Sequence, residues 1–151
     1  MSDDQILQNK TIIVTGASTG IGRAFSVSCA SYGAKIIVAD MNSGEETVEI
    51  IKSKGGEAKF VEVDVANEKS TDLMAKAAYD WTGRVDGLIN NAAYFREVKL
   101  TPFEEIDVAV WDKIFDVNVK GIWQCSKAVI PYMRNNNGGS IRSEEHTSEL
   151  Q

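Results

Sequence analysis

Hydrophobic residues in the first part of the chain alternate between two spacings. Short continuous runs rich in β-branched residues are typical of buried strands, and between them apolar residues recur every three or four positions, as along one face of a helix. This order favours right-handed strand–helix–strand crossovers and a parallel sheet covered on both faces. We therefore predict an α/β fold with a doubly wound parallel sheet of about four strands in the order 3-2-1-4. The predicted strands cover residues 11–15, 35–39, 59–63 and 85–89.

Local signals indicate where the first helices begin and end. The first helix is expected over residues 21–32. Ser43 has a glutamate three residues later, a spacing typical of a helix N-terminus, and the helix that it opens should end at Gly55. A third helix carries an apolar stripe from Leu73 to Trp81 and should end at Gly83.

A long helix is expected in the second half of the chain. Thr101 also has a glutamate three residues later, and apolar residues with helical spacing follow it through 111–129. Pro131 should kink this helix near its end. Trp111 and Trp123 lie along it, and we interpret them as core or interface residues rather than ligand contacts.

The composition limits the kind of protein and its partners. With 151 residues, 43% hydrophobic and 25% charged, the chain should form one globular domain. Sixteen basic against 22 acidic residues give a net charge of −6, which argues against nucleic acid and anionic membranes as partners. Asp3 and Asp4 do not suit a secretion signal, and Cys29 and Cys125 lie too far apart in sequence to suggest a disulfide framework or a zinc site. We expect a cytoplasmic protein without a bound metal.

Residues 15–22 read T-G-A-S-T-G-I-G between the first strand and the first helix. A glycine permits a sharp turn or a close approach of the backbone, and the N–H groups of a helix N-terminus attract anions. A purely structural turn would explain one or two of the glycines, but three in this register favour a diphosphate site. The residues expected to line this site are Gly16, Ser18, Thr19, Gly20, Ile21 and Gly22.

Asp40 ends the second strand, where a carboxylate can accept hydrogen bonds from both ribose hydroxyls of an adenine nucleotide. A solvated acid at the strand end is the alternative. Beside a 2′-phosphate the carboxylate would face like charge, at a cost of about 4 kcal/mol per charge at 4 Å with an effective dielectric near 20. Met41 and the two residues after it carry no compensating charge. We therefore expect NAD rather than NADP, with Asp40 and Met41 beside the ribose.

The glycine turn, Asp40, Asp64-Val65, the run N-N-A-A at 90–93 and Asn118 together resemble the short-chain dehydrogenase/reductase family over residues 10–141. The resemblance implies a Rossmann-like domain that binds NAD(P) and hydride transfer between the nicotinamide and a secondary alcohol or ketone. It further implies that the whole protein is a homo-oligomer, either a dimer or a tetramer.

The same resemblance implies roles for the later motifs. Asp64 would accept a hydrogen bond from the adenine amino group, while the backbone of Val65 borders the ring. The turn formed by Asn91, Ala92 and Ala93 would flank the adenosine ribose and stiffen the sheet. The family usually has glycine where Ala93 stands, so a positive φ is not expected there. Asn118 matches the helix asparagine whose main chain holds a water of the proton relay.

The family's catalytic serine and its Tyr-x-x-x-Lys unit are missing from this sequence. The four tyrosines are followed, four residues later, by Ile36, Gly83, Val98 and Asn136. Residues 138–141 resemble the beginning of the family's fifth strand, and neither Ser143 nor Ser148 stands in a catalytic context. We expect an inactive fragment with an unpaired sheet edge and exposed apolar surface.

The last ten residues have no strand pattern and contain the single histidine, His146. We interpret residues 142–151 as a non-native tail that resembles a translated sequencing adapter, after an incomplete dinucleotide-binding domain at 1–141. A genuine polar tail is the alternative.

Two other functions compete with the oxidoreductase. A non-catalytic nucleotide-binding or scaffolding protein could use the same half-fold. A methyl-donor-binding transferase ranks last, because its turn usually reads G-x-G-x-G and it has no need of Asn91 or Asn118.

Overall fold

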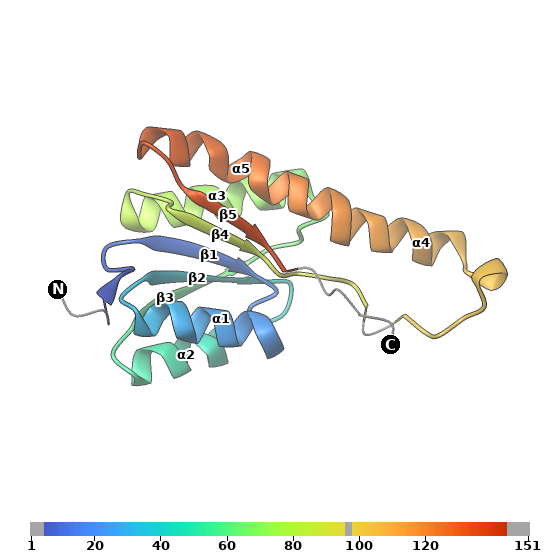
Figure 1. Cartoon of the computed structure of the whole chain (residues 1–151), viewed down its shortest axis with the longest axis horizontal. Helices are drawn as coiled ribbons and strands as arrows, with labels where there is room; N and C mark the ends of the chain where they lie inside the picture. The colour runs from blue at the N-terminus through green and yellow to red at the C-terminus, as the bar shows by residue number, and fades with distance from the viewer. Residues whose placement is uncertain (1–4, 96–97, 145–151) are drawn as a thin grey trace.

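The computed structural model describes residues 5–95 and 98–144. Its centre is a five-stranded sheet in the order β3-β2-β1-β4-β5, in which every neighbouring pair is parallel (Figure 1). The predicted order 3-2-1-4 is confirmed, and a fifth strand extends the sheet beyond β4. The strands are β1 Thr11–Thr15, β2 Lys35–Asp40, β3 Glu57–Glu62, β4 Gly87–Asn90 and β5 Ser140–Ser143.

Helices cover both faces of the sheet, as predicted. Helices α1 and α2 lie on one face, and α3 and α5 lie on the other (Figure 1). A short 3₁₀ helix at Phe103–Glu105 precedes α4, and a π-helical segment at Asp116–Lys120 joins α4 to α5 in one long rod that extends past the sheet. The α-helices are α1 Gly20–Ser31, α2 Glu45–Ser53, α3 Glu68–Thr82, α4 Val108–Phe115 and α5 Gly121–Asn135.

Strands β1 and β2 are buried along almost all of their length because each has a hydrophobic core on both sides. Ile12 and Val14 of β1 pack in the core beneath α1 and α2, whereas Ile13 between them packs with Met74 and Val129 of α3 and α5. Successive side chains of a strand point to opposite faces. The continuous β-branched runs therefore mark central strands of a sheet covered on both sides.

Two predicted helix starts are wrong. Helix α2 begins after Gly44 rather than Ser43, and the backbone of Gly44 packs so closely that a Cβ there would lie 2.6 Å from Val38 Cγ1. Helix α4 begins after Asp107, whose side chain accepts a hydrogen bond from Ala109 N at 2.7 Å. The predicted end of α3 is confirmed, since Gly83 caps it with a left-handed φ of 75°.

The prediction that the last ten residues lack strand structure is wrong for the first two of them. Arg142 pairs with Ile89 and Ser143 with Asn90 in β5, and Glu144 N donates to Asn90 O at 2.9 Å. Strand pairing uses backbone groups, so polar side chains do not prevent it on an edge strand. Residues 145–151, with His146 and Ser148, lie outside the described residues.

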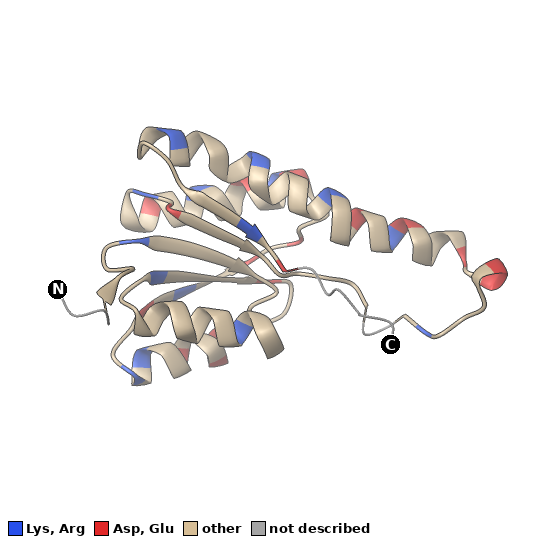
Figure 2. Ribbon diagram, in the orientation of Figure 1, with Lys and Arg blue, Asp and Glu red and all other residues tan. Residues whose placement is uncertain are grey.

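The rod carries the exposed apolar surface that the sequence predicts. Trp111 is 50% exposed, Phe115 45% and Trp123 58%, so neither tryptophan is a core residue. Val129 of α5, by contrast, is fully buried in the core between the sheet and helices α3 and α5. Acidic and basic residues are interspersed along the same rod (Figure 2). Within the described part of the chain, no helix is long and apolar enough to cross a membrane.

Candidate functional site

The turn between β1 and α1 has the backbone geometry expected of its glycines. Gly16 and Gly20 adopt positive φ values of 65° and 58°. A Cβ at Gly22 would lie 2.2 Å from Gly16 O and 2.5 Å from Asn91 Nδ2, so α1 could not approach the turn so closely with any other residue there. The turn and the start of the helix are thus tightly packed together.

The N-terminus of α1 has no side-chain cap. Thr19, the residue before the helix, is extended and forms no capping hydrogen bond, whereas Asn67 caps α3 by accepting from Ser70 N at 3.0 Å. The N–H groups of a first helical turn have no acceptor within the helix, and they carry partial positive charge. Thr19, Gly20 and Ile21 are exposed. These groups can therefore bind an anion such as a phosphate.

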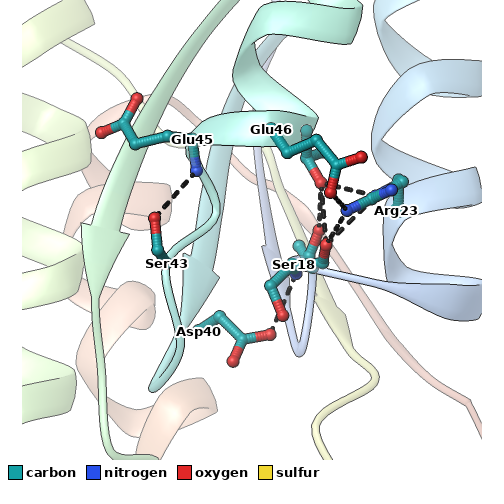
Figure 3. A network of polar contacts seen from close by, with 8 residues as sticks. Ser18, Arg23, Asp40, Ser43, Glu45 and Glu46 are labelled. Atoms are coloured by element: carbon teal, nitrogen blue, oxygen red, sulfur yellow. Dashed lines mark hydrogen bonds and ion pairs between the residues drawn. The ribbon is translucent and has the colours of Figure 1, made fainter.

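The structure brings Asp40 directly onto the glycine turn. One oxygen of its carboxylate, Oδ2, accepts a hydrogen bond from Ser18 N at 2.9 Å (Figure 3). The other oxygen, Oδ1, accepts from Asn42 N at 2.9 Å. Met41 beside it is 66% exposed. The predicted ribose acceptor and the predicted diphosphate turn thus form one continuous site at the carboxyl ends of β1 and β2.

Sequence analysis missed a polar network behind this turn. Arg23 and Thr47 both contact the carbonyl oxygen of Ser18, and Arg23 also forms an ion pair of 2.6 Å with Glu46 (Figure 3). Thr47 is fully buried. No motif marks either residue, because their partner is a backbone carbonyl, which lies five residues from Arg23 and 29 residues from Thr47.

The predicted N-A-A turn joins the ends of β1 and β4. Asn91 Nδ2 donates to Thr15 O at 3.0 Å and to Gly16 O at 3.1 Å, while the N–H groups of Asn91 and Ala92 donate to Thr15 Oγ1. Ala93 is not among the described residues with positive φ, in agreement with its replacing glycine.

Asp64 and Val65 follow β3 on the same edge of the sheet. Asp64 Oδ1 accepts from Ala66 N at 2.9 Å and so fixes the local turn. Val65 is 6% exposed, and its carbonyl accepts from Gln124 Nε2 at 2.9 Å. Because Asp40 pairs with Glu62 across the sheet, these residues lie next to the end of β2.

Asn118 lies within the π-helical segment of the rod. Its Oδ1 accepts from Tyr94 N at 2.7 Å, and its Nδ2 donates to Tyr94 O at 3.3 Å. The side chain therefore holds the loop that follows β4 by a reciprocal pair of hydrogen bonds. The sequence marked Asn118 but not this partner. Among the described residues, no three or more His, Cys, Asp or Glu side chains gather as a potential metal site.

Fold, turn and strand-end acid agree with one family. The sequence model of the family described as short chain dehydrogenase matches residues 10–142. The chain belongs to this family. The resemblance and the fold class predicted from the sequence are confirmed.

The chain is similar to several oxidoreductases. It is 41% identical over 137 residues to the uncharacterized oxidoreductase YxbG of Bacillus subtilis, covering 89% of this chain and 49% of that protein. It is 36% identical over 134 residues to glucose 1-dehydrogenase 2 of the same organism, covering 87% and 51%. The chain thus spans about half the length of the curated relatives it matches.

Two solved structures of dehydrogenases have a similar fold. A hydroxysteroid dehydrogenase from Escherichia coli matches with a TM-score of 0.86 at 32% identity, over 95% of this chain and 60% of that one. A short-chain type dehydrogenase/reductase from Mycobacterium marinum matches with a TM-score of 0.87 at 28% identity, over 95% and 59%.

Proposed function

We propose that this chain is the dinucleotide-binding part of an oxidoreductase that transfers hydride between a nicotinamide and a secondary alcohol or ketone. One observation carries the proposal. The carboxylate of Asp40 is hydrogen-bonded to the glycine turn, which leads directly into a helix N-terminus without a side-chain cap. A carboxylate that can accept from ribose hydroxyls and N–H groups that can bind a phosphate are therefore adjacent, which supports binding of an adenine dinucleotide.

The residues present fit such a ligand. The N–H groups from Thr19 to Gly22 would hold the diphosphate and Asp40 the ribose hydroxyls. Asp64 and Val65 would border the adenine, and Asn91 to Ala93 the sugar. The nicotinamide, when bound, supplies the hydride donor or acceptor.

NAD is the expected cofactor. In the proposed binding mode the negative charge of Asp40 would face the 2′-phosphate of NADP, and exposed Met41 brings no compensating charge. The basic residue of the network, Arg23, is already paired with Glu46 and with the Ser18 carbonyl. Half of the repulsion of about 4 kcal/mol between such charges already corresponds to more than tenfold in affinity.

This sequence alone would bind without turnover. Asn118 would serve the proton relay through its main chain, since its side chain is engaged with Tyr94. The serine and the Tyr-x-x-x-Lys unit of the family do not occur in the sequence. A second candidate is a nucleotide-binding protein without catalysis, which would use the same turn and strand-end acid. The methyl-donor-binding transferase is disfavoured by the family assignment.

Assembly and location follow from the same proposal. The exposed apolar side chains of Trp111, Phe115 and Trp123 support a dimer or tetramer of the whole protein. Cys29 and Cys125 are both free thiols, which supports a reducing cytoplasm.

Calorimetric titration of the chain with NADH, NADPH and S-adenosylmethionine tests the function. We expect binding of NADH, with NADPH at least tenfold weaker and no heat from S-adenosylmethionine. Asp40→Asn keeps an oxygen that can accept from Ser18 N but removes the charge. It should therefore weaken the binding of NADH and reduce the difference in affinity between NADH and NADPH. Asp112→Asn on exposed α4 is the charge-matched control. Absence of binding by either dinucleotide would refute the proposal.

A further inference from the structure

We infer that Arg23 and Thr47 are positioning residues, which orient the peptide groups of the glycine turn for the diphosphate without touching it. The inference rests on the proposed dinucleotide function. It concerns a part of the molecule behind the turn, where α1 and α2 meet (Figure 3).

The carbonyl oxygen of Ser18 has an unusual number of donors. Arg23 Nε lies 3.1 Å from it, Arg23 Nη2 2.5 Å and Thr47 Oγ1 3.2 Å. Thr47 Oγ1 also lies 3.0 Å from Ala17 O and accepts from Arg23 Nε at 3.0 Å. A hydroxyl has one hydrogen, so Thr47 donates to one of the two carbonyls at a time. Two consecutive carbonyls of the turn are thereby drawn toward α2.

The planarity of the peptide unit turns this contact into a direction for the N–H groups. In a trans peptide the carbonyl and the following N–H point to opposite sides, and the described chain has no cis peptide. The carbonyl of Ala17 faces Thr47, and the next N–H, that of Ser18, donates to Asp40. By the same rule, the carbonyl of Ser18 faces Arg23 and Thr47, so the N–H of Thr19 points away from α2. Thr19 is exposed and leads into the uncapped N-terminus of α1.

Arg23 is engaged in a way that makes it a support rather than a phosphate ligand. Its Nη2 contacts both Ser18 O and Glu46 Oε2, the latter at 2.6 Å, and its Nε contacts Ser18 O and Thr47 Oγ1. The side chain of Arg23 is 25% exposed. The carboxylate of Glu46 compensates its charge, so the guanidinium stabilises a backbone carbonyl and leaves anion binding to the N–H groups opposite.

The experiment separates the diphosphate from the rest of the nucleotide. ADP and adenosine share base and ribose, so the ratio of their affinities isolates what the turn contributes. Thr47→Val keeps the shape and removes the hydroxyl, whereas Thr47→Ser restores it. Thr71→Val is the matched control, because Thr71 is also fully buried and its hydroxyl donates to a backbone carbonyl, Glu68 O, on α3 rather than on the glycine turn.

We expect Thr47→Val to weaken the binding of NADH and ADP about three- to tenfold, which is the equivalent of one ordinary hydrogen bond. Arg23→Met should weaken them more. Both substitutions should leave the affinity for adenosine within about twofold of the wild-type value. Thr47→Ser and Thr71→Val should bind NADH and ADP with the affinity of the wild type. Urea unfolding of each variant supplies the stability readout, and Arg23→Met and Thr47→Ser keep the test available if Thr47→Val does not fold.

Three results would overturn the inference. In the first, Thr47→Val binds NADH with the same affinity as Thr71→Val. In the second, Thr47→Val loses affinity for ADP and for adenosine to the same extent, which would indicate a general loss of structure in the site. Arg23→Met could weaken ADP while Thr47→Val does not, which would make Arg23 a phosphate ligand. A wild-type chain that binds neither NADH nor ADP would refute the proposed function itself. That result is distinguishable from a failure of the inference about Arg23 and Thr47, because it is measured on the wild type alone.

Discussion

Substitution of Gly22 by alanine separates helix propensity from packing, because the two predict opposite signs. Gly22 is the third residue of α1, and alanine in a helix interior is favoured over glycine by about 1 kcal/mol. The contact geometry opposes this. The added Cβ would lie 2.2 Å from Gly16 O, well inside an ordinary contact of 3.4 Å, and 2.5 Å from Asn91 Nδ2.

The magnitude follows from the groups that must move. Neither neighbour is the free end of a flexible side chain, since one is a backbone oxygen and Asn91 Nδ2 is bound to Thr15 O and Gly16 O. Overpacking of this kind costs about 1–3 kcal/mol, and loss of one of these hydrogen bonds costs about 1 kcal/mol more. After the gain in propensity, we expect Gly22→Ala to lower the free energy of unfolding by about 1–3 kcal/mol.

Urea unfolding followed by tryptophan fluorescence measures the effect. A loss of about 2 kcal/mol lowers the midpoint by roughly 1 M for a typical m-value. Ala24→Gly, at an exposed position of the same helix, gives the local propensity difference without the contact. The NADH affinity of Gly22→Ala should fall as well, because α1 must move off the turn. A variant as stable as the wild type would refute the packing argument.

Three further outcomes follow from contacts outside the site. Burial would raise the pKa of Asp86, but hydrogen bonds from Arg84 and Thr11 N, with the charges of Arg84 and Lys10, outweigh it and hold the pKa below its usual value. This stability is present above the unfolded carboxyl pKa of about 3.9 and is lost as the pH falls through the lower folded value. Asp86→Asn should therefore cost about 1–2 kcal/mol at pH 7, and little only once the pH is below the lowered folded pKa, measured by urea unfolding. Burial raises the pKa of Cys125 to about 12, so iodoacetamide at pH 8 should modify Cys29 first and Cys125 only after unfolding in urea. Peptide mapping by mass spectrometry measures this, and equal rates of modification of the two thiols would contradict it. Asn67→Ala removes the cap of α3 and should cost about 1 kcal/mol, whereas an unchanged urea midpoint would show that the cap contributes nothing.

The sheet was predictable because its signal is local. A continuous β-branched run such as residues 36–38 fits a strand buried on both faces and little else, and the crossover rule then determines the order. The helix starts at Ser43 and Thr101 were not predictable in the same way. The capping spacing does not by itself fix the first residue of a helix, and the observed residues before α2 and α4 are Gly44 and Asp107.

The candidate site divides in a similar manner. Gly16, Gly22 and Asp40 could be found because a turn with positive φ, a close helix and a strand-end acid each restrict the residue type. Thr47 could not, since any small residue suits a helix start, and only the fold places its hydroxyl beside carbonyls 29 and 30 residues earlier. The partner of Asn118 was hidden for the same reason.

The hydrogen bond from Ser18 N to Asp40 has a consequence for engineering cofactor preference. Ser18 is only 5% exposed, so water cannot easily replace the acceptor. Replacing Asp40 by a basic or apolar residue, in order to admit a 2′-phosphate, would leave the N–H of Ser18 without an acceptor. It would also remove the hydrogen bond that holds the glycine turn to the end of β2. A successful redesign must bring in a new oxygen for the N–H along with the new positive charge, which makes it a task of at least two substitutions.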